Sequence, residues 1–270
     1  MVGSDSSPMK NAPLPPPQPV GVARRRFAEL RRRFPVQVSW LEARFSPEGY
    51  LGLHLTIGAV ALIAMAWIFG SIAEDVVTRD PIVLLDQKVA DWFQQHGTPA
   101  FFRAMSAITF FGSGIWITTA TTLGAAVLIW KRAWYRLLIL LLAVPGGGLL
   151  DMFLKVAFHR ARPALEHPLA MLHSYSFPSG HTMGATLLYG LAAVLAFYRV
   201  RTWRGRVWIV VATTSIVFLV GLSRVALGAH FLSDVLGAIA AGLAWLTICV
   251  TSVETLRRRQ LARGKSVSTG

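Results

Sequence analysis

Cysteine, acidic residues and charged residues in general are scarce in this sequence. Of its 270 residues only 15% are charged, and 13 acidic residues stand against 27 Lys and Arg, for a formal net charge of +14. The single cysteine, Cys249, excludes an intramolecular disulfide and is most simply a buried thiol. With 54% hydrophobic residues and a mean hydropathy of +0.51, the chain is too apolar for an ordinary soluble domain.

The basic residues are instead clustered between long apolar blocks, a pattern typical of polytopic membrane proteins. A hydrocarbon core takes about 20 helical residues to cross, and six stretches are close to that length. We therefore predict an all-α fold with six transmembrane helices, in contact with the lipid bilayer and with no nucleic-acid partner. The expected spans are Leu53–Ala73, Gly112–Trp130, Leu137–Val156, Thr182–Tyr198, Val207–Ser223 and Val235–Val253.

The first fifty residues differ in composition from the rest. Residues 1–22 are rich in Pro and Ser and predict disorder. No apolar core follows a short basic start, so we do not expect a cleavable signal peptide. The basic stretch Arg24–Phe34 is interpreted as a topology determinant. The expected organisation is an arm over residues 1–50, a membrane domain over 51–254 and a basic tail over 255–270.

The basic connections also predict the orientation in the cell (inner) membrane. Three connections, Lys131–Arg136, Tyr198–Arg206 and Arg257–Lys265, fall on the same side as the arm. By the positive-inside rule this side is cytoplasmic, and an even number of spans places both termini there. The first outer loop is acidic and contains Leu84–Phe93, which predicts an amphipathic helix in the membrane interface with Trp92 as its anchor.

Three segments place polar residues at the predicted outer face, where cations do not set topology. They are Lys155–Pro163 after the third span, Phe177–Thr182 before the fourth, and Ser223–Asp234 between the fifth and sixth. Charge near a membrane is costly and indicates function. Convergence of segments far apart in the sequence is what an active site requires.

The residue types in these segments indicate phosphate chemistry. Lys155, Arg162 and Arg224 supply three cations, which suit a phosphoryl group whose charge spreads over three oxygens. Ser179 is placed to cap the fourth span, whose first N–H groups would bind an anion, and Gly180 allows close approach of the backbone.

Two histidines complete the candidate site. His230 precedes Asp234 by one helical turn, so the carboxylate can hold one imidazole nitrogen and leave the other free to attack. His181 has no acidic neighbour in the sequence and is the better candidate to protonate a leaving oxygen. Together these groups predict phosphoryl transfer through a covalent phosphohistidine.

Other polar residues are assigned no catalytic role. A zinc site formed by His181, His230 and Asp234 is an alternative, but three nearby cations would oppose a dication, so no metal or other cofactor is expected. Arg103 and Arg160 are interpreted as side chains that extend to lipid headgroups. The remaining histidines are treated as structural: His54, His96, His159, His167 and His173.

At these residues the sequence closely resembles the type 2 phosphatidic acid phosphatase (PAP2) superfamily of membrane lipid phosphatases. The family signatures are Lys, six residues and Arg-Pro; then Pro-Ser-Gly-His; then Ser-Arg, five residues, His, three residues and Asp. Every position matches: Lys155 with Arg162-Pro163, Pro178-Ser179-Gly180-His181, and Ser223-Arg224 with His230 and Asp234.

The resemblance implies a six-helix core, metal-independent hydrolysis and an active site at the outer face. It implies His230 as the nucleophile, Asp234 as the residue that orients it and His181 as the general acid. Around the phosphate it places Lys155, Arg162, Ser179, Gly180 and Arg224. One position differs from what many bacterial relatives lead us to expect: Asp151 stands where we expect Asn, and it would either position Lys155 or weaken its charge.

An outer-leaflet site limits the substrates to lipids presented there. We expect undecaprenyl diphosphate, as in bacterial undecaprenyl-diphosphate phosphatases of the superfamily, and after it phosphatidylglycerophosphate, phosphatidate or lysophosphatidate. Specificity is expected in a membrane-facing groove and in the loop Ala164–Phe177. Two alternatives stay open: a phosphotransferase that passes the phosphoryl group to another lipid such as lipid A, and a non-enzymatic transporter or scaffold.

Overall fold

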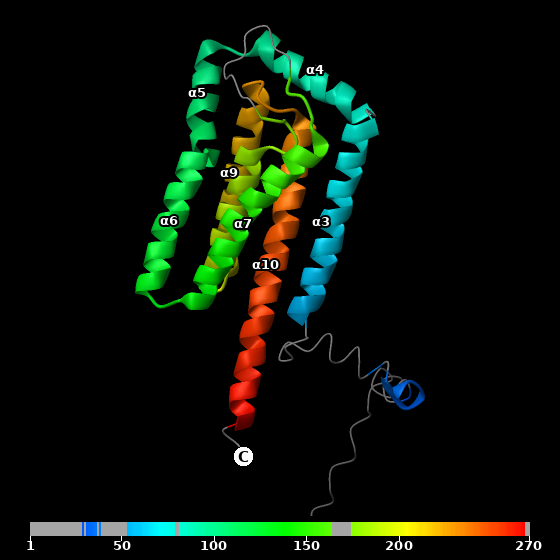
Figure 1. Ribbon diagram of the computed structural model, residues 1–270, viewed down its shortest axis with the longest axis vertical. Helices are drawn as coiled ribbons and strands as arrows, with labels where there is room; N and C mark the ends of the chain where they lie inside the picture. The colour runs from blue at the N-terminus through cyan, green and yellow to red at the C-terminus, as the bar shows by residue number, and fades with distance from the viewer. Residues whose placement is uncertain are drawn as a thin grey trace, which may run out of the picture.

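The structure, a computed structural model, describes residues 29, 31–36, 38, 53–78, 81–163 and 174–267. Most of the predicted amino-terminal arm, and residues 164–173 of the predicted specificity loop, lie outside this part. Every regular element within it is helical, as Figure 1 shows. The elements are α3 (Leu53–Thr78), α4 (Pro81–His96), α5 (Pro99–Thr109), the 3-10 helix η1 (Phe110–Gly112), α6 (Gly114–Trp130), α7 (Trp134–Phe158), α8 (Gly180–Phe197), α9 (Trp203–Ala226) and α10 (Leu232–Val267).

Six helical segments are long and apolar enough to cross a membrane, which confirms the predicted fold class. Each predicted span overlaps one of them: Leu55–Thr78, Pro99–Trp130, Trp134–Phe158, Gly180–Phe197, Trp203–Ala226 and Leu232–Leu261.

The second span was predicted too short, because it begins at Pro99 and not at Gly112. It is built from α5, η1 and α6 in succession, with a break at Ser113. The Ser113 hydroxyl accepts a hydrogen bond from the backbone N–H of Trp116 at 3.2 Å and so caps α6. The earlier start could not be recognised from the sequence because Arg103 interrupts the apolar run of α5.

The apolar core lies between α7, α8 and α10. Ala143 of α7, Leu187 of α8 and Ala238 of α10 are almost completely buried in it. Close packing of α7 against α8 depends on Gly147, because a Cβ atom there would lie 2.2 Å from a methyl carbon of Leu187. Neighbouring Gly148 differs, since nothing lies within 4 Å of where its Cβ would be.

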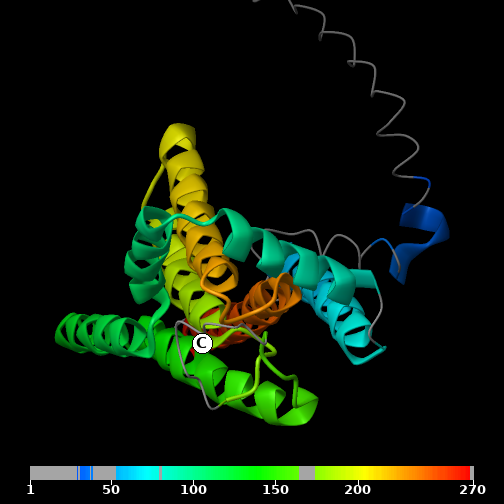
Figure 2. The same cartoon turned by 90° about the horizontal axis from the view of Figure 1, so that it is seen from above.

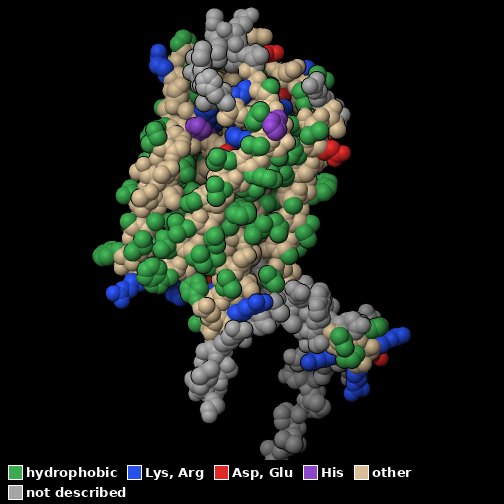
Figure 3. Space-filling view, in the orientation of Figure 1, with side chains coloured by type: hydrophobic (Ala, Val, Ile, Leu, Met, Phe, Trp, Pro, Cys, Tyr) green, Lys and Arg blue, Asp and Glu red, His purple; other side chains and the backbone are tan. Residues whose placement is uncertain are grey.

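The two ends of the bundle differ in what they carry. The α6–α7 and α8–α9 connections and the carboxyl end of α10 lie at one end, whereas the α7–α8 and α9–α10 connections lie at the other (Figure 1). Figure 3 shows apolar side chains over the middle of the molecule and Lys and Arg toward its ends. The three polar segments identified in the sequence therefore share one end.

Helix α4 crosses this end of the bundle (Figure 2) and contains the predicted amphipathic helix. Leu85 and Trp92 stay 48% and 55% exposed, as a membrane-facing side requires. The opposite face packs on the protein through Asp86 and Ala90, and Asp86 is completely buried. The sequence placed Asp86 in an acidic outer loop and did not anticipate its burial.

Candidate active site

Backbone contacts bring the three polar segments together. The N–H of Ser179, before α8, donates to the carbonyl of Asp234 at the start of α10 at 3.1 Å. The N–H of His230 donates to the carbonyl of Arg224, at the end of α9, at 3.2 Å. Lys155 of α7 donates through Nζ to the carbonyl of Pro178 at 2.7 Å. Four helix ends are thereby fixed around one site.

Two residues with positive φ make these connections possible. His159 ends α7 in the left-handed conformation, with φ of 47°, and its N–H still donates to the carbonyl of Lys155 at 3.1 Å. Gly228 has a φ of 67° between α9 and α10, a conformation that glycine adopts without steric cost. These turns direct Arg160 and Arg162 on one side, and His230 on the other, back over the bundle.

His230 and Asp234 form the predicted pair. His230 Nδ1 lies 3.4 Å from Oδ2 of Asp234, and the two side chains are 3% and 0% exposed. On the other side of the ring, Nε2 lies 3.2 Å from Nη1 of Arg162. A guanidinium can only donate, so this contact indicates that Nε2 is unprotonated and that the ring proton is on Nδ1, facing the carboxylate. The lone pair of Nε2 therefore points toward the cationic side of the site.

Burial determines the protonation state of His230. It lowers the pKa of the imidazole to about 4, although the hydrogen bond and the charge of Asp234 act in the opposite direction. The cations Arg162 and Arg224 lower the pKa of His230 further. At neutral pH the imidazole is therefore uncharged and able to act as a nucleophile.

We expect the acid limb of kcat/KM for hydrolysis to lie near the His230 pKa of about 4, and not at the ordinary histidine value of 6.5. Because the pKa is lowered, Nε2 stays unprotonated as the pH falls from neutral. It becomes protonated, and activity is lost, only when the pH approaches the lowered pKa of His230. The measurement is a pH profile corrected for ionisation of the substrate phosphate, whose second pKa is about 6. A corrected limb centred on the ordinary value would contradict the assignment of His230.

Two cations, Arg162 and Arg224, lie close to this imidazole. Arg162 is held by the carbonyl groups of Ala229, at 2.6 Å, and Ser174, at 2.8 Å. Arg224 is 5% exposed and donates through Nη1 to Oγ1 of Thr109 at 3.0 Å. Within the described residues its Nε is buried and has no hydrogen-bond partner. An unsatisfied buried donor of this kind is suited to an anionic oxygen.

The start of α8 contributes backbone groups to the same site. Ser179 occupies the N-cap position, as predicted, but its side chain makes no capping hydrogen bond. Its hydroxyl instead accepts from Oγ1 of Thr182 at 3.1 Å, which corrects the expectation that Ser179 caps the helix through its side chain. At Gly180 a Cβ would lie 3.0 Å from Oδ2 of Asp151 and 3.4 Å from Nζ of Lys155, so a larger residue would crowd the site.

Asp151 is paired with Lys155. Both carboxylate oxygens lie 2.7 Å from Nζ, and the side chains are 14% and 13% exposed. This geometry supports the positioning role considered for Asp151, because the carboxylate fixes the ammonium group against the Pro178 carbonyl. The same contact reduces the net charge that Lys155 offers to an anion.

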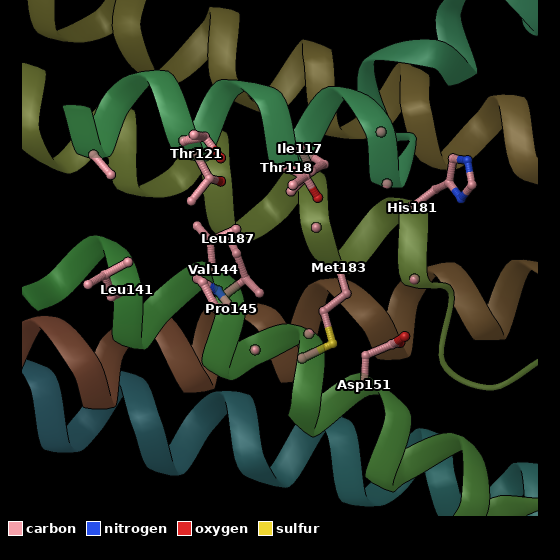
Figure 4. A pocket seen from close by; sticks show the side chains of 18 residues that line it. Ile117, Thr118, Thr121, Leu141, Val144, Pro145, Asp151, His181, Met183 and Leu187 are labelled. Carbon is pink, nitrogen blue, oxygen red and sulfur yellow. The ribbon is translucent and has the colours of Figure 1, made fainter. Parts of the chain in front are cut away.

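His181 lies at one end of a cavity of about 660 Å³ between α6, α7 and α8, as the close-up in Figure 4 shows. Asp151 lines the same end, and the walls beyond it are apolar or carry hydroxyl groups. In the described part of the chain the His181 ring has no hydrogen-bond partner, so it is free to contact a ligand. Residues that line the cavity away from this end include Thr121, Leu141, Val144 and Leu187. Gly148 also lines the cavity.

The interpretation of Arg160 as a lipid-facing side chain was wrong. Its side chain is 10% exposed and donates to Oδ1 of Asp234 at 2.5 Å and to Oδ2 of Asp86 at 2.8 Å. Sequence reasoning missed this role because Arg160 lies outside the matched signature positions and its partner Asp86 is 74 residues away. One sequence signal could have indicated this contact: Asp86 lies on the same helical face as the apolar residues Ala90 and Phe93, so its carboxylate was placed to be buried.

The other polar residues set aside in the sequence show no contact with this site where they are described. His96 is exposed and stacks on Trp92, and His159 is exposed and packs against Tyr175. Arg103 is exposed on α5. The side chain of His54, together with His167 and His173, lies outside the described residues.

Comparison with known proteins places this geometry in a family. The PAP2 superfamily profile matches residues 134–258. Phosphatidylglycerophosphatase B of Bacillus subtilis is 35% identical over 152 residues, which are 54% of this chain and 71% of that protein. A lipid A 1-phosphatase of Rhizobium etli is 31% identical over 216 residues, 74% of this chain and 83% of that protein. The crystal structure of a transmembrane PAP2 type phosphatidylglycerolphosphate phosphatase from Bacillus subtilis has a TM-score of 0.62 and 28% identity, over 70% of this chain and 94% of that chain.

Proposed function

The chain belongs to the PAP2 superfamily and is a membrane lipid phosphatase, and we propose that it cleaves its lipid phosphate through a phosphohistidine formed on His230. The observation that carries the proposal is the buried His230–Asp234 pair, whose free Nε2 lies 3.2 Å from Arg162. A bound phosphoryl group would displace the guanidinium from Nε2, and Arg162 would then donate to the phosphoryl oxygens. The carboxylate would stabilise the positive charge that develops on the imidazole during attack.

The reaction proceeds in two displacements. Nε2 of His230 attacks phosphorus, the bond from phosphorus to the lipid oxygen breaks, and His181 donates a proton to that oxygen. A water molecule then enters where the lipid left, and His181 accepts its proton as the oxygen attacks phosphorus. The phosphorus–nitrogen bond breaks, which releases inorganic phosphate and restores His230.

Charge stabilisation is assigned to the three cations. Lys155, Arg162 and Arg224 surround the phosphoryl oxygens, with Ser179 and the backbone at Gly180 completing the cradle. We propose that no metal ion takes part, because these cations would repel a dication. Among the described residues no three His, Cys, Asp or Glu side chains are placed together as metal ligands, which gives the zinc alternative no support.

The cavity beside His181 suits the lipid portion of the substrate. It adjoins the proton donor, so a lipid whose oxygen leaves toward His181 would extend its tail between α6 and α7. Its lining is mainly apolar along most of its length, as an acyl or prenyl chain requires. This placement accounts for a phosphatase that acts on membrane lipids.

Replacing Gly148 with leucine is expected to lower kcat/KM for long-chain lipid phosphates by about tenfold or more, because the added side chain would occupy the lipid cavity. Space for it exists, since nothing lies within 4 Å of the Gly148 Cβ position. A short-chain lipid phosphate should be affected much less, and the ratio of the two rates is the measurement.

Gly70→Leu on α3 is the matched control, because its Cβ position is equally open and Gly70 does not line this cavity. Equal losses on long and short substrates in Gly148→Leu, with Gly70→Leu unaffected, would place the tail elsewhere.

The substrate is proposed from two lines of support. Phosphatidylglycerophosphate is favoured by the names of the Bacillus subtilis relative and of the similar crystal structure. Undecaprenyl diphosphate, the substrate expected from the sequence, is favoured by a site at the outer leaflet. Phosphatidate remains a third candidate, because the tail cavity carries few groups that would select a headgroup.

The orientation is proposed from charge. The end of the bundle opposite the site carries Lys131 and Arg132 at the α6–α7 turn, Arg199 and Arg201 at the α8–α9 turn, and Arg257. By the positive-inside rule this end is cytoplasmic, together with both termini. The active site then opens at the outer face of the cell membrane.

Phosphate release by the detergent-purified protein, with EDTA present, tests the proposed function. We expect release from at least one of phosphatidylglycerophosphate, undecaprenyl diphosphate and phosphatidate, with the relative rates ranking them. Vanadate should inhibit as a phosphoryl mimic. Activity that EDTA abolishes and zinc restores would overturn the metal-independent mechanism.

A lipid acceptor distinguishes hydrolysis from phosphoryl transfer. The relative named lipid A 1-phosphatase makes lipid A a relevant acceptor as well as a relevant substrate class. Labelled phosphate that appears on lipid A, with little free phosphate, would identify a phosphotransferase. Lipid movement without hydrolysis would favour the transporter alternative.

A further inference from the structure

Buried charged groups connect helix α4 to the His230–Asp234 pair. Asp86 of α4 is completely buried, and its Oδ2 accepts from Nη2 of Arg160 at 2.8 Å. Nη1 of the same guanidinium donates to Oδ1 of Asp234 at 2.5 Å. One arginine therefore bridges two buried carboxylates, and the second of these is the one that faces the imidazole.

Asp86 also fixes the start of α10 directly. Its Oδ1 accepts from the backbone N–H of Ser233 at 2.9 Å, and its Oδ2 accepts from the Ser233 hydroxyl. This N–H belongs to the first turn of α10 and has no partner within the helix. Arg160 adds a bond from Nη1 to the Ser233 hydroxyl at 2.7 Å. Helix α4 thus supplies a cap to the helix that carries Asp234.

These contacts fix which oxygen of Asp234 meets the imidazole. Oδ2 accepts from the N–H of Phe231 at 2.9 Å and from the hydroxyl of Ser176, and it lies 3.4 Å from His230. Oδ1 is held on the opposite side by Arg160, whose guanidinium also lies 4.6 Å from the centre of the Phe231 ring. Rotation of the carboxylate would break bonds on both oxygens.

We propose that Asp86 and Arg160 are positioning residues for phosphate release, through which α4 sets the orientation of Asp234 and hence the basicity of His230. The inference rests on the proposed function of His230. Arg160 lines a cavity together with Lys155 and Arg162, but its guanidinium is engaged by Asp234, Asp86 and Ser233. Arg160 therefore acts through Asp234, and the completely buried Asp86 acts through Arg160 and Ser233. Asp86 lies outside the region that the family profile matches, residues 134–258.

The charges around His230 determine the direction in which its proton affinity should change when Asp86 or Arg160 is replaced. The imidazole faces Asp234 from α10, Arg162 from the segment after α7, Arg224 from α9 and His181 from α8. Arg160 lies behind Asp234 and offsets part of the negative charge that the imidazole senses. Removing the Arg160 charge would raise the proton affinity of His230, whereas removing the Asp86 charge would lower it.

Four variants of the full-length, detergent-purified protein test this. Asp86→Asn is expected to lower kcat about tenfold to a hundredfold, the loss typical of a misplaced catalytic group, with KM nearly unchanged because no phosphate contact is lost. The acid limb of the pH–rate profile of Asp86→Asn should move to lower pH. Arg160→Lys keeps the charge and should retain part of kcat with the limb in place, whereas Arg160→Gln should move the limb to higher pH.

Asp91→Asn is the matched control, since Asp91 is exposed on the same helix. It should behave as the native protein. Thermal unfolding of each variant is measured in parallel, and Asp86→Asn and Arg160→Lys decide the question if Arg160→Gln does not fold. Substrate ionisation is common to all variants, so differences in the limb report on the protein.

Two outcomes would overturn the proposal. One is kinetics of Asp86→Asn and Arg160→Lys that match Asp91→Asn. The other is a loss that appears in KM, or that follows the unfolded fraction while the acid limb stays fixed. These outcomes are distinct from failure of the proposed function, in which the native protein itself would release no phosphate or His230→Ala would remain active.

Discussion

Replacing His230 with alanine is expected to reduce phosphate release by about 10⁴- to 10⁶-fold, the range found when a catalytic nucleophile is removed. The imidazole has no substitute in the site, because no other described histidine besides His181 lies beside the three cations. The fold should persist, since the uncharged side chain makes two polar contacts, with Arg162 at 3.2 Å and with Asp234 at 3.4 Å. Initial rates of phosphate release, measured in EDTA, give the comparison.

His159→Ala is the control for this prediction. His159 is exposed, and its ring packs against Tyr175 and not against the cation cluster. It should keep most of the native activity. Comparable losses in the two variants would mean that the histidines contribute through stability and that the site is misassigned.

The second large effect is expected at Arg224. Arg224→Ala should reduce kcat/KM by about a hundredfold to a thousandfold, as removal of a preorganised donor to a transition-state oxyanion does. The reason is the buried Nε, which is free of protein partners within the described residues while Nη1 is held by Thr109. Arg224→Lys should recover little, because an ammonium group cannot reproduce both contacts.

Arg103→Ala provides the matched control, since it removes the same charge from an exposed position on α5. Inhibition by vanadate gives a second readout, and it should weaken in Arg224→Ala but not in Arg103→Ala. Unchanged vanadate affinity in Arg224→Ala would show that Arg224 does not contact the anion.

Those residues of the site that lie in signature motifs could be predicted from the sequence. Membrane topology alone brings Lys155, Arg162, His181 and His230 to one face, because alternate connections of a helical bundle share a side. The His230–Asp234 pair follows from helical spacing, although His230 itself precedes α10. The six-helix fold was predicted for the same reason, since its signal is the length of apolar blocks.

What could not be predicted depends on contacts between distant segments. The sequence gives no reason to pair Asp86 with Arg160, because 74 residues and two spans separate them. An arginine at a helix end is ordinarily solvated, but Arg160 is enclosed between Asp86 of α4 and Asp234 of α10. The break between α5 and α6 was missed for a local reason, since a charged residue in α5 outweighed the apolar residues around it.

The sequence likewise could not show which cations of the site are neutralised by a neighbouring carboxylate. Asp151 and Lys155 pair through both carboxylate oxygens, so a permanent cation counted from the sequence is partly neutralised in the fold. Arg224 is the opposite case, with a buried donor left available. The cations that matched the motifs are therefore not equivalent, and Arg224 is expected to contribute more than its spacing alone indicates.

Capture of the covalent intermediate tests the central claim most directly. The native protein would be mixed with phosphatidylglycerophosphate carrying a labelled terminal phosphate, quenched in alkali during the first turnover and digested for mass spectrometry. We predict one phosphoryl group on the peptide that contains His230, stable in alkali, lost in acid and absent from His230→Ala. Label on a different residue, or full-rate phosphate release without any labelled histidine, would contradict the mechanism.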